Sequence, residues 1–228
     1  MKNVLFKTSQ KQLFLGSLLL FALATFSQEK LKDTTKVNQL DEVLVSAIRV
    51  TSKTPVSFSN LSQKEIKTRN LGQDIPILMN YMPSVVTTSD AGNGVGYTGI
   101  RVRGSDATRV NVTINGIPYN DSESHGTFWV NMPDFASSLQ SIQLQRGVGT
   151  STNGAGAFGA SLNMLTDSYS EKAYGEISNS FGSFNTKKHT VKFSTGLLND
   201  RFEIAGRLSK LESEGYIDRA SSDLKSYF

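Results

Sequence analysis

Apolar and polar side chains alternate along most of the second half of this chain. Three segments of about ten residues share the pattern, separated by short turn-rich breaks: 173–182, 187–196 and 201–211. In the last of them Phe202, Ile204 and Leu208 lie on one face of an extended strand. Alternation at this length is typical of the wall strands of a transmembrane β-barrel. A soluble β-meander has the same local pattern, so both interpretations stay open at this point.

Two short helices are predicted before residue 85. Ser62 and Glu65 have the spacing of a capping box, in which each side chain binds a free amide at the start of a helix. Residues 74–82 follow with apolar side chains at helical spacing, and Pro83 ends the pattern. Strand-like runs surround both helices. The pattern is one of strands alternating with short helices, and the fold class that follows is α+β.

The clearest hairpin signal lies in the middle of the chain. An alternating run at 110–120 reaches Asn115-Gly116, the dipeptide that best fits a two-residue turn between antiparallel strands. A glycine-rich loop at 89–99 precedes this hairpin, and a polar, partly aromatic loop at 121–131 follows it.

A glycine-rich segment, 145–166, follows a short predicted strand. It contains five glycines together with several apolar residues, so we expect it to be packed rather than to form a solvated linker. Gly154, Gly156 and Gly159 have the spacing of the dinucleotide-binding fingerprint. That motif requires a helix after the glycines, whereas residues 160–166 are strand-like. Nucleotide binding is therefore not predicted.

Composition and charge indicate export. The chain has 228 residues, no cysteine and a net charge of +4. Without cysteine, a disulfide, a thiolate metal site and a lipoprotein anchor are all excluded. Residues 1–27 carry Lys2, Lys7 and Lys11 with no acidic residue, so the rest of the chain has a net charge of 4 − 3 = +1 and nucleic-acid binding is not expected. The apolar run at 13–24 is too short to span a membrane and predicts a signal peptide over 1–27.

A short apolar run follows a polar tail at 28–39. Its residues are Asp41, Glu42, Val43, Leu44, Val45, Ser46 and Ala47. The run could be the first strand of a sheet. An extended peptide at the end of a flexible tail can also be captured by the open sheet edge of a partner protein, and this second interpretation stays open.

No catalytic or metal-binding constellation is found. His125 lies beside the acidic and hydroxyl residues at 121–124, but neighbours in one loop seldom supply a separate nucleophile, base and orienting group. Three arginines, Arg101, Arg103 and Arg146, are more informative. If they are enclosed, each needs a carboxylate or carbonyl partner, and otherwise they lie on the surface.

Three stretches in order carry a family resemblance: DEVLVSA, GIRVRGSDATRVNVTINGIPYND and GTFWVNMPDFASSLQSIQLQRGVGTSTNGAGAFGASLNMLT. From about Asp41 to its end the chain resembles the N-terminal part of a TonB-dependent outer-membrane receptor, in the ferric-citrate-receptor-like iron-complex group. The resemblance implies a plug domain, which is a small mixed sheet with short helices, followed by the first antiparallel strands of a transmembrane β-barrel that would enclose it. It also implies a location in the outer membrane and no enzymatic activity. The expected organisation is a signal peptide at 1–27, a tail with a TonB box at 28–52, a plug at 53–167 and the first barrel strands at 168–228.

The resemblance also implies partners and site residues. Residues 41–47 match the TonB box, which pairs with periplasmic TonB by strand addition. Arg103 and Arg146 match plug arginines that pair with glutamates of the barrel wall. The loops implied to face an iron chelate supply Asp90, Asn93, Tyr97, Asp121, His125, Phe128 and Trp129. No cofactor, metal site or nucleic-acid partner is implied. Val148 stands where the family pattern commonly has proline.

The length of the chain leads to a further expectation. A barrel that encloses a plug needs about 22 strands, whereas the pattern provides three, with residues 212–228 read as one polar segment. An open sheet in lipid leaves backbone groups without partners. The expectation is therefore a truncated receptor, not competent for transport alone, and the alternative is a secreted, soluble β-rich binding protein. A downstream reading frame that continues the alternating segments would favour the receptor.

Overall fold

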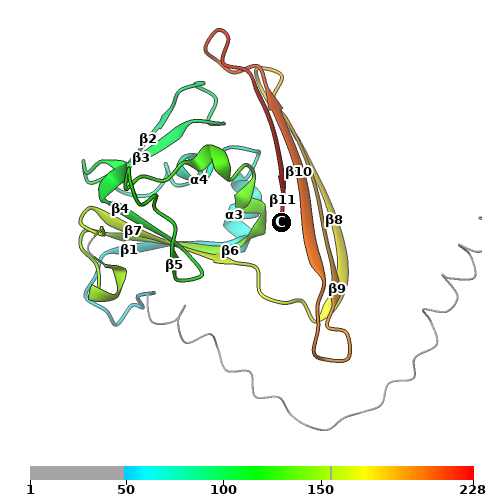
Figure 1. Cartoon of the computed structure of the whole chain (residues 1–228), viewed down its shortest axis with the longest axis horizontal. Helices are drawn as coiled ribbons and strands as arrows, with labels where there is room; N and C mark the ends of the chain where they lie inside the picture. Colours follow the sequence, from blue (N-terminus) through cyan, green and yellow to red (C-terminus); the bar gives the residue numbers. More distant parts are fainter. Residues whose placement is uncertain (1–48, 155) are drawn as a thin grey trace, which may run out of the picture. The chain divides into compact units, whose positions relative to one another are not determined.

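The computed structural model describes residues 49–154 and 156–228 (Figure 1). The predicted signal peptide at 1–27 and the predicted TonB box at 41–47 lie outside the described residues. Two sheets of different character make up most of the described chain, and a two-stranded hairpin accompanies the first.

The first sheet has five strands in the order β1-β6-β7-β4-β5. Its strands are β1 (Phe58–Ser62), β4 (Val110–Ile114), β5 (Ile117–Pro118), β6 (Leu139–Arg146) and β7 (Ala160–Thr166). β4 and β7 run parallel, and the other neighbouring pairs run antiparallel. The sheet is mixed, as the family resemblance implies.

Two α-helices lie on one face of this sheet, α3 (Gln63–Arg69) and α4 (Ile75–Leu78) (Figure 1). The predicted capping box is confirmed, because Ser62 and Glu65 bind each other's backbone amides. The second predicted helix is shorter than 74–82. The residues after Leu78 form turns instead of continuing the helix. Pro83 disfavours a helical conformation at the residue before it. No helix in the described part of the chain is long and apolar enough to cross a membrane.

The hairpin prediction is also confirmed. β4 and β5 are joined through Asn115 and Gly116, whose φ angles of 50° and 84° are those of a turn with two left-handed residues. A second hairpin, formed by β2 (Val85–Ser89) and β3 (Thr98–Val102), carries most of the predicted loop at 89–99. The remaining helical turns are 3₁₀: η1 (Ala107–Arg109), η2 (Trp129–Asn131), η3 (Phe135–Ser138) and η4 (Ser151–Asn153).

The central strands β6 and β7 bury both of their faces. On one face Leu144 and Leu162 are paired across the strands in the apolar core beneath the helices. On the other face Gln143 accepts a hydrogen bond from the Val50 amide and donates one to the Val50 carbonyl. Asn163 accepts a bond from the Thr113 hydroxyl. The pairing of Gln143 matters because a buried amide without a partner would cost about 1–3 kcal/mol.

Glycine packs closely where β7 begins. The prediction that the whole glycine-rich segment is packed is only partly confirmed, because Val148 and Phe158 are more than 60% exposed. The Gly159 amide donates to the Arg109 carbonyl, and a Cβ added at Gly159 would lie 2.5 Å from Ser105 Cβ and 3.0 Å from that carbonyl oxygen. A Cβ at Gly156 would meet no atom within 4 Å. The two glycines therefore differ in packing although they belong to the same segment.

This difference gives a prediction. Gly159→Ala is expected to lower the free energy of unfolding by about 1–3 kcal/mol, because backbone and Ser105 would have to move. Gly156→Ala, the matched control, is expected to change it by less than about 0.5 kcal/mol. Urea denaturation followed by the fluorescence of Trp129, the only tryptophan, measures both. Equal stability of the two variants would contradict the close packing at Gly159.

The second sheet is a four-stranded antiparallel meander. Its strands are β8 (Lys172–Phe181), β9 (Lys187–Gly196), β10 (Ala205–Ser213) and β11 (Ser222–Tyr227), each paired with its neighbour in sequence. The prediction of three strands, with 212–228 as one polar segment, is wrong. β11 was missed because small hydroxyl residues, Ser222 and Ser226, alternate with its exposed positions, so no apolar periodicity marks it.

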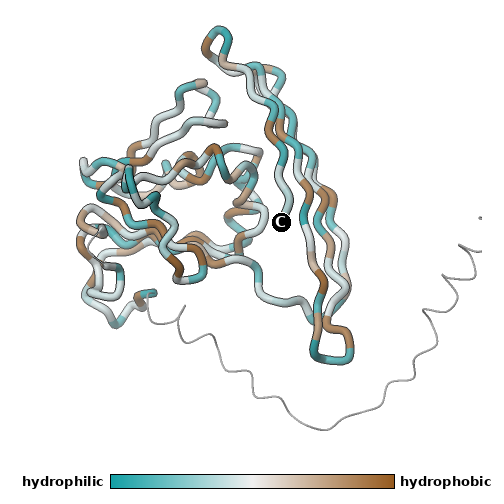
Figure 2. The backbone as a smooth tube through the Cα atoms, viewed as in Figure 1, coloured by the Kyte–Doolittle hydropathy of each residue, from teal (hydrophilic) through white to brown (hydrophobic). Residues whose placement is uncertain are grey.

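The two faces of this meander distinguish the alternatives that the sequence left open. One row across the sheet, Ile177, Val191, Leu208 and Tyr227, is between 44% and 87% exposed. The opposite face carries polar residues that are buried, among them Lys188, Thr190, Arg207 and Ser209. Hydrophobic and hydrophilic residues are mixed along all of these strands (Figure 2). A soluble meander buries its apolar face instead. An apolar outer face is typical of strands that contact lipid.

Candidate functional site

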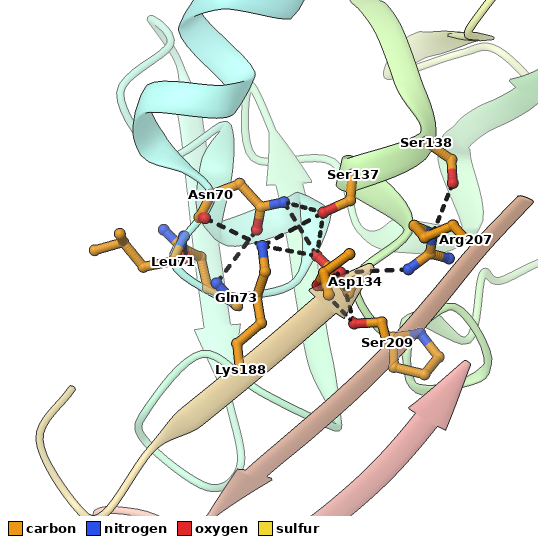
Figure 3. A network of polar contacts seen from close by, with 12 residues as sticks. Asn70, Leu71, Gln73, Asp134, Ser137, Ser138, Lys188, Arg207 and Ser209 are labelled. Atoms are coloured by element: carbon orange, nitrogen blue, oxygen red, sulfur yellow. Dashed lines mark hydrogen bonds and ion pairs between the residues drawn. The ribbon is translucent and has the colours of Figure 1, made fainter. Parts of the chain in front are cut away.

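A buried ionic cluster joins the two sheets. The carboxylate of Asp134, at the start of η3, lies 3.0 Å from Lys188 Nζ on β9 and 3.3 Å from Arg207 Nη1 on β10 (Figure 3). All three residues are at most 3% exposed. We call this group the Asp134 cluster and include in it the four polar neighbours described next.

Four neutral groups complete the surroundings of Asp134. Ser137 Oγ donates at 2.6 Å, Thr190 Oγ1 and Ser209 Oγ at 2.7 Å, and Asn70 Nδ2 at 3.1 Å. Burial by itself would raise the pKa of Asp134. The positive charge of Lys188 and the hydroxyl donors outweigh this and lower the pKa to about 2. The carboxylate is therefore ionised at neutral pH.

Local geometry explains how the sequence builds the cluster. Asp134 has a φ of 51°, a left-handed conformation that aspartate tolerates better than most residues. Lys188 and Thr190 are two residues apart on β9, so they share the inner face of the sheet. Arg207 and Ser209 do the same on β10. The cluster thus draws on alternate residues of two strands and on one turn.

Further polar contacts extend the junction in two directions. Arg207 Nε donates to Ser138 Oγ, and Ser226 on β11 donates to the Pro133 carbonyl. On the other side Lys192 is paired with Asp167, and Lys67 of α3 lies 2.8 Å from Glu176 of β8. The last four residues line a polar cleft of about 380 Å³ between α3 and β8.

The first residues that the structure describes contact β6 and β7. These are the central strands of the first domain, which comprises the five-stranded sheet and its helices. Arg49 donates to the hydroxyl and carbonyl of Ser141 on β6 and to the carbonyl of Asn163 on β7. The next residue, Val50, is paired with Gln143. A segment attached just before Arg49 is therefore linked to the middle of the five-stranded sheet.

A family model now identifies this first domain. Residues 50–161 match the model of the TonB-dependent Receptor Plug Domain. These residues form a TonB-dependent receptor plug domain. The match covers the five-stranded sheet up to the start of β7 and supports the family resemblance seen in the sequence. The ferric-citrate-receptor-like subgroup stays a prediction. No curated protein matches the chain.

Solved structures share the fold of the plug and the strands after it. The pyoverdine outer-membrane receptor FpvA of Pseudomonas aeruginosa matches with a TM-score of 0.59 and 16% identity over 76% of this chain and 24% of its own. The alcaligin outer-membrane receptor FauA of Bordetella pertussis matches with 0.56 and 18% over 71% and 27%. The siderophore receptor PirA of Acinetobacter baumannii matches with 0.51 and 21% over 69% and 24%. This chain therefore spans about a quarter of the length of these receptors. Two of the three are named as outer-membrane receptors, in agreement with the predicted location.

The predicted plug–barrel arginines occupy different environments. Arg146 donates to the hydroxyls of Ser57 and Ser59 on the plug's own N-terminal segment. Arg103 is exposed, and its guanidinium lies beside Gly147. Within the described residues neither forms an ion pair, so their pairing with a wall carboxylate stays a prediction. The ion pairs of Asp134 and Asp167 with the second sheet have the opposite polarity, with the carboxylate on the plug. The Lys67–Glu176 pair has its cation on the plug.

The β2–β3 loop, residues 90–97, holds the first set of predicted substrate-facing residues. Asp90 and Tyr97 are exposed, whereas Asn93 Nδ2 donates to Ser213 Oγ at the end of β10. The Ala91 carbonyl accepts bonds from the amides of Tyr216 and Ile217. The loop is therefore fastened to the connection between β10 and β11.

The second predicted loop gives one correction. Asp121, His125 and Phe128 are exposed, and Asp121 accepts bonds from the Ser124 amide and hydroxyl, which lower its pKa. Trp129 is only 3% exposed and belongs to the plug core, so its indole does not face a substrate. The burial of Trp129 could not be predicted from the loop sequence, because it depends on the 3₁₀ turn η2, which directs the side chain inward. No group of three metal-ligating side chains occurs in 49–154 and 156–228.

Proposed function

We propose that this chain is the plug-bearing portion of a TonB-dependent outer-membrane receptor that takes up an iron–siderophore complex. One observation carries the proposal: a plug domain is joined by the buried Asp134 cluster to strands whose opposite face is apolar. A plug bound to lipid-facing strands fits a transport receptor and not an enzyme.

The titles of the structural neighbours support the substrate class. They name a siderophore receptor, a receptor for alcaligin and a receptor bound to pyoverdine. The exposed residues Asp90, Tyr97, Asp121, His125 and Phe128 remain our candidates for contact with the iron complex. A secreted, soluble binding protein is the alternative, but the exposed apolar row on the second sheet counts against it.

The proposed partner is periplasmic TonB, bound through residues 41–47. Strand addition uses main-chain hydrogen bonds, so proline within this segment removes a donor and alters the allowed backbone angles. Because the segment ends just before Arg49, force applied to it would reach β6 and β7 through the contacts of Arg49 and Val50.

Leu44→Pro is therefore expected to abolish site-specific crosslinking between the receptor and TonB. Thr34→Pro, which places proline in the polar tail before the segment, is the control and should crosslink as the unaltered protein does. Crosslinking of cysteine pairs introduced into residues 41–47 and TonB measures the effect. Unchanged crosslinking of the Leu44→Pro variant would refute strand addition at this segment.

A further inference from the structure

A buried carboxyl group lies beneath the β2–β3 loop of the plug. Asp74 is 5% exposed and occupies the position before α4 where a side chain usually caps the helix. Its carboxylate makes no bond to α4. The group is therefore available for contacts with another element.

Those contacts are with the second half of the loop and the start of β3. Thr98 Oγ1 donates to Asp74 Oδ2 at 2.9 Å, and the Gly96 amide also donates to the carboxylate. The Asp74 amide donates to the Gly94 carbonyl at 2.9 Å. Asp74 thus binds three alternate residues, Gly94, Gly96 and Thr98, where the loop leads into β3.

The first half of the same loop is held by the second sheet, which we call the wall. Ala91 and Asn93 bind the connection between β10 and β11, as described above. A Cβ at Gly92 would lie 2.9 Å from the ring of Tyr216, so the approach is close. Asp74 is consequently the plug-side attachment of a loop whose other attachment is on the wall.

Among the described residues, no cation is paired with the carboxylate of Asp74. The titratable or charged side chains on the surrounding elements are Asp90 and Tyr97 in the loop, Arg69 at the end of α3, Tyr81 after α4, Arg101 on β3, Lys188 near Gly72, and Glu214, Tyr216, Asp218 and Arg219 in the connection between β10 and β11. None of these side chains shifts the pKa of Asp74. Burial raises its pKa to about 7, and the bonds from Thr98 and Gly96 only partly oppose this.

We propose that Asp74 is a proton-controlled tether of the β2–β3 loop, which holds the loop closed when the carboxyl is neutral and releases it when ionised. A buried carboxylate without a cation gains hydration when the loop opens, whereas the neutral acid does not need it. The inference rests on the proposed function only in regarding this loop as ligand-facing. The tether itself requires no substrate.

The direction of the pH dependence follows from linkage. The pKa of Asp74 is raised from 3.8 in the reference state to about 7 in the closed state. Closed Asp74 therefore binds more protons than open Asp74 between these values, and the closed loop loses stability as the pH rises from about 4 to 7. Above about 7 the dependence ends.

Amide hydrogen exchange of the full chain in detergent tests the tether. After correction for intrinsic exchange rates, protection of the Asp74 and Gly96 amides is expected to fall at least tenfold between pH 5 and pH 8. Asp74→Asn should remove this change, whereas Asp90→Asn, an exposed aspartate in the same loop, should keep it. Unchanged protection in the unaltered chain, or a full pH response in Asp74→Asn, would overturn the proposal.

A second measurement covers the case in which Asp74→Asn does not fold. The carboxyl carbon of Asp74 in the unaltered chain can be titrated by NMR, and a midpoint near neutral pH is expected. A midpoint near that of the exposed aspartates would overturn the proposal. Neither measurement depends on TonB or on iron uptake, so failure of the tether and failure of the proposed function are distinguishable.

Discussion

Replacing Asp134 by asparagine is expected to lower the free energy of unfolding by about 3–5 kcal/mol. The substitution leaves Lys188 and Arg207 buried with no negative charge beside them. Asparagine also tolerates the left-handed φ of 51°, so the backbone contributes little to the loss. Urea denaturation of the full chain in detergent, followed by Trp129 fluorescence, measures the change.

Two further observations separate the charge from other effects. Asp90→Asn, at an exposed site, should change stability by less than about 0.5 kcal/mol. The pKa of Asp134 is lowered in the folded state, so its contribution is present above the reference value of 3.8 and is lost as the pH falls towards 2. A loss below about 1 kcal/mol on Asp134→Asn would show that the cluster is solvated rather than buried.

Removing every charge of the cluster together is expected to restore most of that stability. In the triple variant Asp134→Asn, Lys188→Met, Arg207→Met, no buried charge remains unpaired, and methionine replaces the long side chains with similar volume. We expect the triple variant to lie within about 2 kcal/mol of the unaltered chain. The same urea denaturation measures it, with the Lys188→Met and Arg207→Met double variant as the matched control.

The double variant is expected to be less stable than the triple one, because it leaves Asp134 ionised and without a cation. Equal losses in the single, double and triple variants would mean that size and shape, rather than charge, hold the plug against the wall. The comparison therefore identifies what the Asp134 cluster contributes at the junction.

Much of the plug fold was predictable because its signals are local. The capping box at Ser62, the turn at Asn115-Gly116 and the strand-like continuation after Gly159 each depend on a few adjacent residues. The alternating pattern likewise predicted β8 and β9 closely. The alternation did not predict the environment of each face, since the polar face of these strands could have contacted either water or protein.

The Asp134 cluster was not predictable from the chain alone. Its residues are distributed between positions 70 and 209, and no spacing links Asp134 to Lys188 or Arg207. The signal that could have indicated it is weak: a charged residue alternating with a hydroxyl residue on each of two neighbouring strands. The family resemblance instead places the positive charge on the plug, at Arg103 and Arg146.

The contacts between the plug and the second sheet also indicate which interactions would have to break during transport. The β2–β3 loop is bound to the wall at one end and to Asp74 at the other, and the Asp134 cluster lies where the connection from α3 begins at Asn70. Residues 41–47 are followed directly by contacts to β6 and β7. Under the proposed function, force at the TonB-binding segment therefore acts on a sheet that is fixed to the wall by buried ion pairs.

Uptake of labelled iron by living cells tests the central claim most directly. In an iron-limited strain deleted for the complete receptor gene of which this chain is the plug-bearing portion, uptake of at least one ferric siderophore from a panel of catecholates, hydroxamates and carboxylates should be lost. The complete gene should restore it, and the same gene with Leu44→Pro should not, while its product still binds the complex at the cell surface. Unchanged uptake of every siderophore in the deletion strain, or full restoration by Leu44→Pro, would contradict a TonB-dependent receptor for an iron complex.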